Sequence, residues 1–286
     1  MEDLGTKFIT VKERNIRYTV RGSGAPIILI HGFGEFLEVW WFNIGPLSEH
    51  YQVYAMDLPG HGLSDKSGNG YTPPFFTELI SDFMQALRIE RAHLIGHSLG
   101  GAICLSMAIN SPGKVDMVIL VDSGGLDKEV SLLYRLCALP FIGEIIMRPT
   151  IKAGLRHGIK RAFYNPDLVA EEIVDWYYEI MRKPETKQAM LNLIRSNVDF
   201  SGLYPDVVLK DKLHLVKAPT LFIHGEQDAV IPLVHAQKAC KLVPNARLEV
   251  FAECGHCPHI EKAPEFNKVV LAFLESNGQK GVHNGG

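Results

Sequence analysis

The stretch AHLIGHSLGGAICLSMAIN, residues 92–110, places one serine between a short apolar run and a longer one. The first run is typical of a buried strand, and the second has the length of a helix. Between them, Gly96, Ser98 and Gly100 form the pattern G-x-S-x-G. In this context the pattern predicts a strained strand-to-helix turn that exposes the Ser98 hydroxyl, because side chains two residues to either side would have no room. Residues 110–113, Asn-Ser-Pro-Gly, predict the end of the helix.

A helix that begins at Leu99 directs its first backbone N–H, and the positive end of its dipole, toward the place where an oxyanion would form. A serine hydroxyl is a weak nucleophile until a base, usually a histidine, removes its proton, and an acid then fixes the tautomer of that histidine. For a turn of this kind the expected order along the chain is serine, acid, histidine. Both partners are therefore expected C-terminal to Ser98.

Buried strands alternate with helices on both sides of this stretch. A hairpin at residues 7–21, with its turn at Arg14–Asn15, comes first. Continuous apolar strands are typical of a mostly parallel sheet with helices on both faces, joined by right-handed crossovers. The sequence therefore predicts an α/β fold. The expected strands span residues 26–30, 51–56, 117–121, 219–224 and 247–251, and the expected helices span 77–87, 233–242 and 264–276.

The alternation stops between residues 123 and 212, where no buried strand run occurs. We interpret residues 124–211 as a helical cap inserted into a core made of residues 1–123 and 212–286. The last ten residues, 277–286, have nothing to bury and are expected to be frayed. The helices expected in the cap, separated by Pro and Gly, span residues 130–139, 143–151, 166–182 and 184–197.

The composition is that of a globular protein, with 47% hydrophobic and 21% charged residues. The net charge of −3 is spread over interspersed charges, which excludes a basic surface for nucleic acid. The acidic N-terminus differs from a signal peptide, and no apolar run is long enough for a membrane span, so we expect a cytoplasmic chain without stable membrane insertion. Five scattered cysteines are an odd number and predict no disulfide framework.

One acid and one histidine fit the expected order after Ser98. Asp228 and His256 each follow a predicted strand, so both lie at the carboxyl edge of the sheet together with Ser98. We predict that Ser98 is the nucleophile, His256 the base and Asp228 the acid; Asp122 and Glu226 are rival acids. Only His256 lies between the last strand and the last helix, although five other histidines lie near this edge: His31, His61, His97, His224 and His259.

The loop His31-Gly-Phe-Gly34 follows the strand at residues 26–30 and brings backbone N–H groups close to the turn at Ser98. We predict that the N–H groups of Phe33 and Leu99 form an oxyanion hole. His31 itself is expected to be a structural, hydrogen-bonded residue.

Five motifs give the chain a resemblance to the α/β-hydrolase family over nearly its full length. The resemblance implies a mostly parallel eight-stranded sheet, a helical cap that roofs the pocket, and a Ser98–Asp228–His256 triad that works without cofactor or metal. The cap stretch 165–179 is similar to that of carbon–carbon bond hydrolases that act on meta-cleavage products. The motifs are HGFG (31–34), DLPGHGLSD (57–65), GHSLGG (96–101), GEQD (225–228) and GHCPHIEKAPEF (255–266).

Three positions depart from that branch of the family. Its members typically have asparagine before the serine, arginine in this cap helix and tryptophan after the histidine, where this chain has His97, Tyr177 and Cys257. A dienoate carboxylate needs a cationic partner in a dry pocket, so the missing arginine favours a carboxylesterase. Haloalkane dehalogenases and epoxide hydrolases would carry aspartate in place of Ser98.

Apolar residues of the cap and of the region near residue 40 are expected to line or roof the substrate pocket. Arg135 and Glu144 interrupt the apolar run of the cap, which disfavours a lid that contacts lipid. Besides Leu132 and Leu133 in the roof, the candidate pocket residues are Trp40, Trp41, Leu136, Phe141, Tyr177 and Cys257.

The segment Cys254-Gly-His-Cys257 matches the C-x-x-C pattern of thiol-disulfide oxidoreductases, and with His259 it also resembles a zinc site. The chain lacks a thioredoxin-like domain and His256 already has a role, so we predict neither a redox function nor a metal.

We predict a cofactor-free serine hydrolase that cleaves carboxylic esters of small to medium, largely apolar substrates through an acyl-enzyme. Two alternatives remain: a carbon–carbon bond hydrolase of the meta-cleavage type, and a small-molecule receptor of the same fold with slow turnover. The expected partner is a small-molecule ester, and the sequence does not define the oligomeric state.

Overall fold

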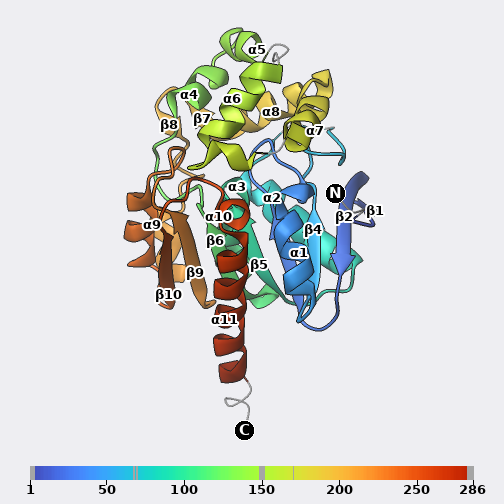
Figure 1. Cartoon of the computed structure of the whole chain (residues 1–286), viewed down its shortest axis with the longest axis vertical. Coiled ribbons are helices and arrows are strands. Elements are labelled where there is room, and N and C mark those ends of the chain that lie inside the picture. Colours follow the sequence, from blue (N-terminus) through green and yellow to red (C-terminus); the bar gives the residue numbers. More distant parts are fainter. Residues whose placement is uncertain (1–3, 67, 69, 148–151, 170, 282–286) are drawn as a thin grey trace.

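An eight-stranded sheet forms the centre of the molecule (Figure 1). The computed structural model describes residues 4–66, 68, 70–147, 152–169 and 171–281. The strand order is β1-β2-β4-β3-β5-β6-β9-β10; β1 and β2 run antiparallel to their neighbours and all other pairs are parallel. The predicted α/β class and mostly parallel eight-stranded sheet are confirmed. The strands are β1 (Lys7–Val11), β2 (Arg14–Arg21), β3 (Pro26–Ile30), β4 (Gln52–Met56), β5 (Ala92–His97), β6 (Val115–Val121), β9 (Thr220–Gly225) and β10 (Ala246–Phe251).

Helices cover both faces of the sheet, and the central strands are apolar on both sides for this reason. On β3, Ile28 and Ile30 pack in one core cluster with α2, α3 and α9, while Ile27 and Leu29 pack in the opposite cluster with α1 and α11. The core helices are α1 (Trp41–Ser48), α2 (Pro73–Ala86), α3 (Leu99–Asn110), α9 (Leu233–Cys240), α10 (Pro258–Glu261) and α11 (Ala263–Gly281).

A helical cap is inserted between β6 and β9 and lies beyond one end of the sheet strands (Figure 1). A short antiparallel pair of strands accompanies its helices. None of the described helices is both long and apolar enough to cross a membrane. The cap consists of α4 (Leu132–Ala138), α5 (Ile142–Ile146), α6 (Lys152–Arg161), α7 (Glu171–Met181), α8 (Pro184–Asn197), β7 (Val198–Asp199) and β8 (Gly202–Leu203).

Three local predictions differ from the structure. The first hairpin turns at Lys12–Glu13, both with positive φ, and not at Arg14–Asn15, which pair within the β1–β2 ladder. Helix α6 was not expected, because the two glycines of KAGLRHGIKR weaken the helical pattern. Helix α11 continues to Gly281, so residues 277–281 are helical where a frayed tail was predicted. The ends of the predicted stretches at 148–151 and 282–286, and residue 170, lie outside the described residues.

Candidate active site

Ser98 lies in the turn between β5 and α3 and has a strained backbone. Its φ of 51° and ψ of −112° form a conformation that residues with side chains rarely adopt. The turn can form because Gly96 and Gly100 lack a β-carbon: an added one would lie 2.2 Å from the carbonyl oxygen of Gly100 or 2.1 Å from that of Ile30, respectively. Backbone strain of this kind concentrates at functional sites. Ser98 borders two cavities.

Two backbone N–H groups beside Ser98 are available to a substrate oxygen. Leu99 is the first residue of α3, so its N–H has no partner within the helix. Phe33 lies in the loop after β3, and its N–H donates to no other described residue. Both residues border the same small cavity as Ser98. The oxyanion hole stays a prediction, and the geometry is compatible with it.

His256 and Asp228 come from the loops after β10 and β9, and they are hydrogen-bonded to each other. His256 Nδ1 lies 2.7 Å from Asp228 Oδ2. Asp228 Oδ1 accepts the backbone N–H groups of Val230 at 2.7 Å and Ile231 at 3.0 Å. Burial raises the pKa of Asp228, but attraction to His256 and the hydrogen bond between them outweigh burial and lower the pKa to about 2. Asp228 is therefore a carboxylate at neutral pH that can stabilise an imidazolium.

The second nitrogen of His256, Nε2, forms no hydrogen bond with the described residues and is the atom that the predicted role of base requires. Both residues border a cavity of about 620 Å³ beneath the cap. Among the described residues the Ser98 hydroxyl has no hydrogen-bond partner. Catalytic hydrogen bonds often form only once substrate is bound. The cap contacts this loop directly, because the backbone N–H of His256 donates to the carbonyl of Ala162 at 2.6 Å.

The rival acids differ from Asp228 in charge or position. Asp122, at the end of β6, is fully buried and accepts the N–H of Gly225 at 3.0 Å. Burial and the nearby charge of Asp228 raise the pKa of Asp122 well above its usual range, which favours its neutral form. Glu226 is exposed and accepts from the side chain of Gln227. Neither is placed to act as the charged partner of His256.

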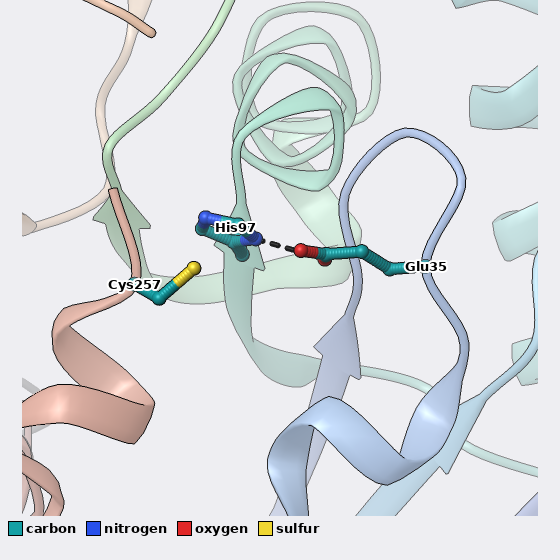
Figure 2. A group of neighbouring side chains, drawn as sticks. All are labelled: Glu35, His97 and Cys257. Carbon is teal, nitrogen blue, oxygen red and sulfur yellow. Dashed lines mark hydrogen bonds and ion pairs between the residues drawn. The ribbon is translucent and has the colours of Figure 1, made fainter. Parts of the chain in front are cut away.

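A buried ion pair lies beside the proposed nucleophile. His97 Nδ1 is 2.9 Å from Glu35 Oε2, and Figure 2 shows these two side chains pointing at each other, with Cys257 on the other side of the ring. The same Glu35 oxygen accepts the backbone N–H of Gly32 at 2.6 Å. His97 Nε2 is 2.8 Å from the carbonyl oxygen of His256. The pair therefore joins the loop after β3, the Ser98 turn and the His256 loop.

The hydrogen bonds of His97 define its protonation state. The carboxylate of Glu35 and the carbonyl of His256 can only accept, so both ring nitrogens of His97 must carry protons. Burial lowers the pKa of His97, but attraction to Glu35 and the hydrogen bond with it outweigh burial and raise the pKa. Burial likewise raises the pKa of Glu35, yet the charge of His97 outweighs it and the pKa falls far below 4.5. The hydrogen bonds and the raised pKa therefore both favour the imidazolium form of His97.

Two side-chain clusters have the donor types of a metal site. Glu35, His97 and Cys257 offer oxygen, nitrogen and sulfur, but both nitrogens of His97 are engaged and burial raises the pKa of the Cys257 thiol well above its usual range. The second cluster contains Asp228, which is hydrogen-bonded to His256: Asp122, His224 and Asp228. The two nitrogens of His97 and both carboxylate oxygens of Asp228 are already engaged in hydrogen bonds, and we assign a metal to neither cluster. The raised pKa of the Cys254 thiol also opposes a redox role for the C-x-x-C pattern.

The predicted pocket residues divide into two groups. Trp41, Tyr177 and Cys257 line the 620 Å³ cavity. Trp40 is fully buried in the core, with its ring 4.6 Å from that of His259, so its assignment to the pocket is wrong.

The cap assignments need a similar correction. Leu136 and Phe141 line neither of the two described cavities. Phe141 is 81% exposed, and Leu132 and Leu133 on α4 are also largely exposed. Helical spacing alone could not tell the inner face of these short helices from the outer one.

Sequence reasoning missed Glu35 and the aromatic wall around Phe36. The ring of Phe36 lies 4.7 Å from that of Tyr177 and 5.7 Å from that of Trp176, and all three line the large cavity. The only signal was position: Glu35 and Phe36 directly follow the HGFG motif at 31–34.

Replacing either aspartate by asparagine tests which one is the acid. Asp228→Asn should lower kcat by about 10⁴-fold, because the amide cannot stabilise the His256 imidazolium. Asp122→Asn should stay within about tenfold of the wild type, since the amide resembles a protonated carboxyl. Steady-state rates, with circular dichroism to verify folding, measure both. The reverse ranking would make Asp122 the acid.

Glu35→Gln tests the buried ion pair through the pH dependence of stability. The pKa of Glu35 lies below its ordinary value of 4.5, and the pKa of His97 lies above its ordinary value of 6.5. Between pH 4.5 and pH 6.5 the pair therefore makes its full contribution to the stability of the folded protein. The stabilisation is lost as the pH rises through the raised pKa of His97. We expect Glu35→Gln to cost about 3 kcal/mol of unfolding free energy near pH 5.5, and less at alkaline pH.

Denaturant unfolding across pH 5–10 measures this effect, and Glu78→Gln is the control because its ion pair with Lys12 is exposed. A difference between the wild type and Glu35→Gln that does not change with pH would contradict a charged pair.

Comparison with known proteins agrees with the fold. The family model described as the alpha/beta hydrolase fold matches residues 25–263. The chain is 31% identical to 2-hydroxy-6-oxo-6-phenylhexa-2,4-dienoate hydrolase of Comamonas testosteroni, covering 94% of this chain and 96% of that one. It is also 32% identical to the dihydrolipoyllysine-residue acetyltransferase component of the acetoin cleaving system of Cupriavidus necator, over 94% of this chain and 68% of that one.

Among solved structures, a meta-cleavage product hydrolase from Pseudomonas fluorescens IP01 superposes with a TM-score of 0.80 at 27% identity, covering 94% of this chain and 97% of that one. The match of the family model over most of the chain, together with the sheet, the turn at Ser98 and the inserted cap, shows that this chain belongs to the α/β-hydrolase family.

Proposed function

We propose that the protein is a serine hydrolase that cleaves carboxylic esters through an acyl-enzyme. The observation that carries the proposal is the 2.7 Å hydrogen bond between His256 and a charged Asp228, beside a serine held in a strained turn. The fold alone would not give this function, because relatives of one fold perform different reactions.

The proposed reaction has two steps that use the same histidine. His256 Nε2 takes the proton of Ser98 as the hydroxyl oxygen attacks the ester carbonyl, and the N–H groups of Phe33 and Leu99 bind the resulting oxyanion. The C–O bond to the alcohol then breaks, and His256 gives its proton to the leaving oxygen. In the second step His256 deprotonates water, the hydroxide attacks the acyl-enzyme, and Ser98 recovers its proton as the acid leaves.

Ser98 borders both cavities, so the acyl group and the alcohol of the ester can each occupy one of them. His256 lines the 620 Å³ cavity and not the smaller one of about 150 Å³. Because His256 must protonate the leaving oxygen, the alcohol belongs in the larger cavity, among the aromatic rings of Trp41 and Tyr177. The acyl group then occupies the smaller cavity, whose walls are largely aliphatic and include Ile103 and Leu126. The arrangement favours a short acyl group on a bulky, apolar alcohol.

The charges around the large cavity favour an ester over a dienoate substrate. None of the described residues that line it is lysine or arginine, whereas Glu35, Glu38 and Glu172 do line it. The one cation, His97, already donates to Glu35 and to the carbonyl of His256. A substrate carboxylate would therefore lose its water without gaining a charged donor. The Comamonas testosteroni relative, named for a dienoate substrate, leaves carbon–carbon hydrolysis as the second candidate.

Initial rates on p-nitrophenyl esters from acetate to palmitate test the proposal, with Ser98→Ala as the blank. Short acyl chains should be cleaved fastest, because the cavity assigned to the acyl group is small. Ser98→Ala should lower kcat by roughly 10⁴- to 10⁶-fold. A parallel assay with 2-hydroxy-6-oxo-6-phenylhexa-2,4-dienoate should show much lower kcat/KM.

Ester hydrolysis within tenfold of wild type in Ser98→Ala would contradict the assignment of the nucleophile. Efficient dienoate cleavage with negligible ester turnover would favour the carbon–carbon hydrolase. Very slow turnover of both, with thermal stabilisation by ligand, would instead favour a receptor.

A further inference from the structure

Glu261, the last residue of α10, holds two separate segments of the chain with one carboxylate. Its Oε1 accepts the backbone N–H of Gly255 at 2.8 Å, in the loop that carries His256. Its Oε2 accepts the backbone N–H groups of Tyr164 at 2.8 Å and of Asn165 at 3.3 Å, in the cap. Helix α10 lies at the end of the core that faces the cap (Figure 1). Each oxygen therefore serves a different segment, and we call these three hydrogen bonds the Glu261 bridge.

The bridge requires a carboxylate. Glu261 forms no ion pair with any described base, and besides the three N–H groups only the thiol of Cys254 lies close to it, at 3.9 Å from Oε1. Hydrogen bonds to a charged acceptor are stronger than those to a neutral one. An amide side chain has a single acceptor oxygen, so glutamine could serve the loop or the cap but not both.

The cap segment 162–165 packs directly against the loop of His256. A β-carbon added at Gly255 would lie 2.5 Å from the carbonyl oxygen of Ala162 and 2.6 Å from the backbone nitrogen of Tyr164. Only glycine therefore lets the two segments approach this closely. In the same contact the N–H of His256 donates to the Ala162 carbonyl at 2.6 Å. The cap thus supplies one of the hydrogen bonds that hold the backbone of His256.

His256 has two other attachments, and both belong to the core. Its ring Nδ1 lies 2.7 Å from Asp228 Oδ2, and its carbonyl oxygen lies 2.8 Å from His97 Nε2. Of these three bonds, the one to the Ala162 carbonyl alone depends on the position of the cap. Because the Glu261 bridge holds the cap segment that contains this carbonyl, the bridge acts on the backbone of His256.

We propose that Glu261 is a positioning residue: it holds the cap against the loop of His256 and thereby keeps the imidazole in place to act on Ser98. The same cap segment contributes Ala162 and Phe163 to the wall of the large cavity. One carboxylate therefore links the wall of the substrate cavity to the catalytic base. The inference rests on the proposed function, because it takes His256 as that base.

Three variants separate the bridge from its charge. Glu261→Gln keeps the size of the side chain but leaves one acceptor oxygen. Glu261→Asp keeps the charge, but its shorter side chain cannot reach both segments. Glu253→Gln is the matched control, because Glu253 is exposed in the same loop and forms no hydrogen bond or ion pair with a described residue. Thermal unfolding verifies that each variant is folded at the assay temperature.

Both Glu261 variants should lower kcat for p-nitrophenyl acetate at least about tenfold, because a misplaced base slows the chemical step. KM should change less, and Glu253→Gln should equal the wild type. Proton NMR gives a readout that a loss of stability alone would not move. The low-field signal of the proton between His256 and Asp228, which Asp228→Asn abolishes, should shift or broaden in both Glu261 variants and not in Glu253→Gln.

The proposal is overturned if Glu261→Gln keeps the kcat of the wild type, or if its low-field signal is unchanged. It is equally overturned if Glu261→Asp equals the wild type while Glu261→Gln is impaired, since the charge and not the bridge would then matter. A wild type without Ser98-dependent ester turnover would contradict the proposed function instead. The NMR signal would still show whether Glu261 positions the ring of His256, so the two failures are distinguishable.

Discussion

The buried ion pair between Glu35 and His97 connects the parts of the site that the sheet alone leaves separate. Parallel strands deliver Ser98, Asp228 and His256 to one edge, but on three loops that could move independently. Through Gly32, His97 and the carbonyl of His256, the pair joins the loop after β3 to the turn at Ser98 and the loop that carries His256. Desolvating two charges is costly, so the pair stabilises the fold little more than apolar side chains would, but once it is buried neither partner can be removed without a large cost.

The same site keeps two neighbouring aspartates in different charge states. Asp228 gains two backbone N–H donors and an imidazole, which keep it ionised, while burial beside that charge raises the pKa of Asp122 and favours its protonated form. One carboxylate can then stabilise the charge that develops on His256, and the other serves as a neutral hydrogen-bonding group. The environment, not the residue type, separates the two roles.

Prediction from the sequence was most accurate where a local pattern is compatible with only one backbone structure. Only glycine fits at residues 96 and 100, so the turn at Ser98 could be predicted, and the strand ends located Asp228 and His256 at the same edge. Features that depend on tertiary contacts were missed. Nothing local showed that Glu35 pairs with a residue 62 positions away, or that Trp40 faces the core while Phe141 faces solvent. Helix α6 was not predicted, because its two glycines weaken the helical pattern of the sequence. The helix is stabilised by its contact with α7, which the sequence does not reveal.

The central claim is that Ser98 forms the covalent bond to the substrate, and an irreversible organophosphonofluoridate tests it most directly. Nucleophilic attack by Ser98 Oγ on phosphorus expels fluoride and leaves one phosphonyl group on the enzyme. The account predicts that loss of esterase activity parallels the appearance of one adduct, which peptide mass spectrometry locates on Ser98, and that Asp228→Asn reacts much more slowly. Inactivation with the adduct on another residue, such as Cys257, while Ser98 stays unmodified, would contradict it.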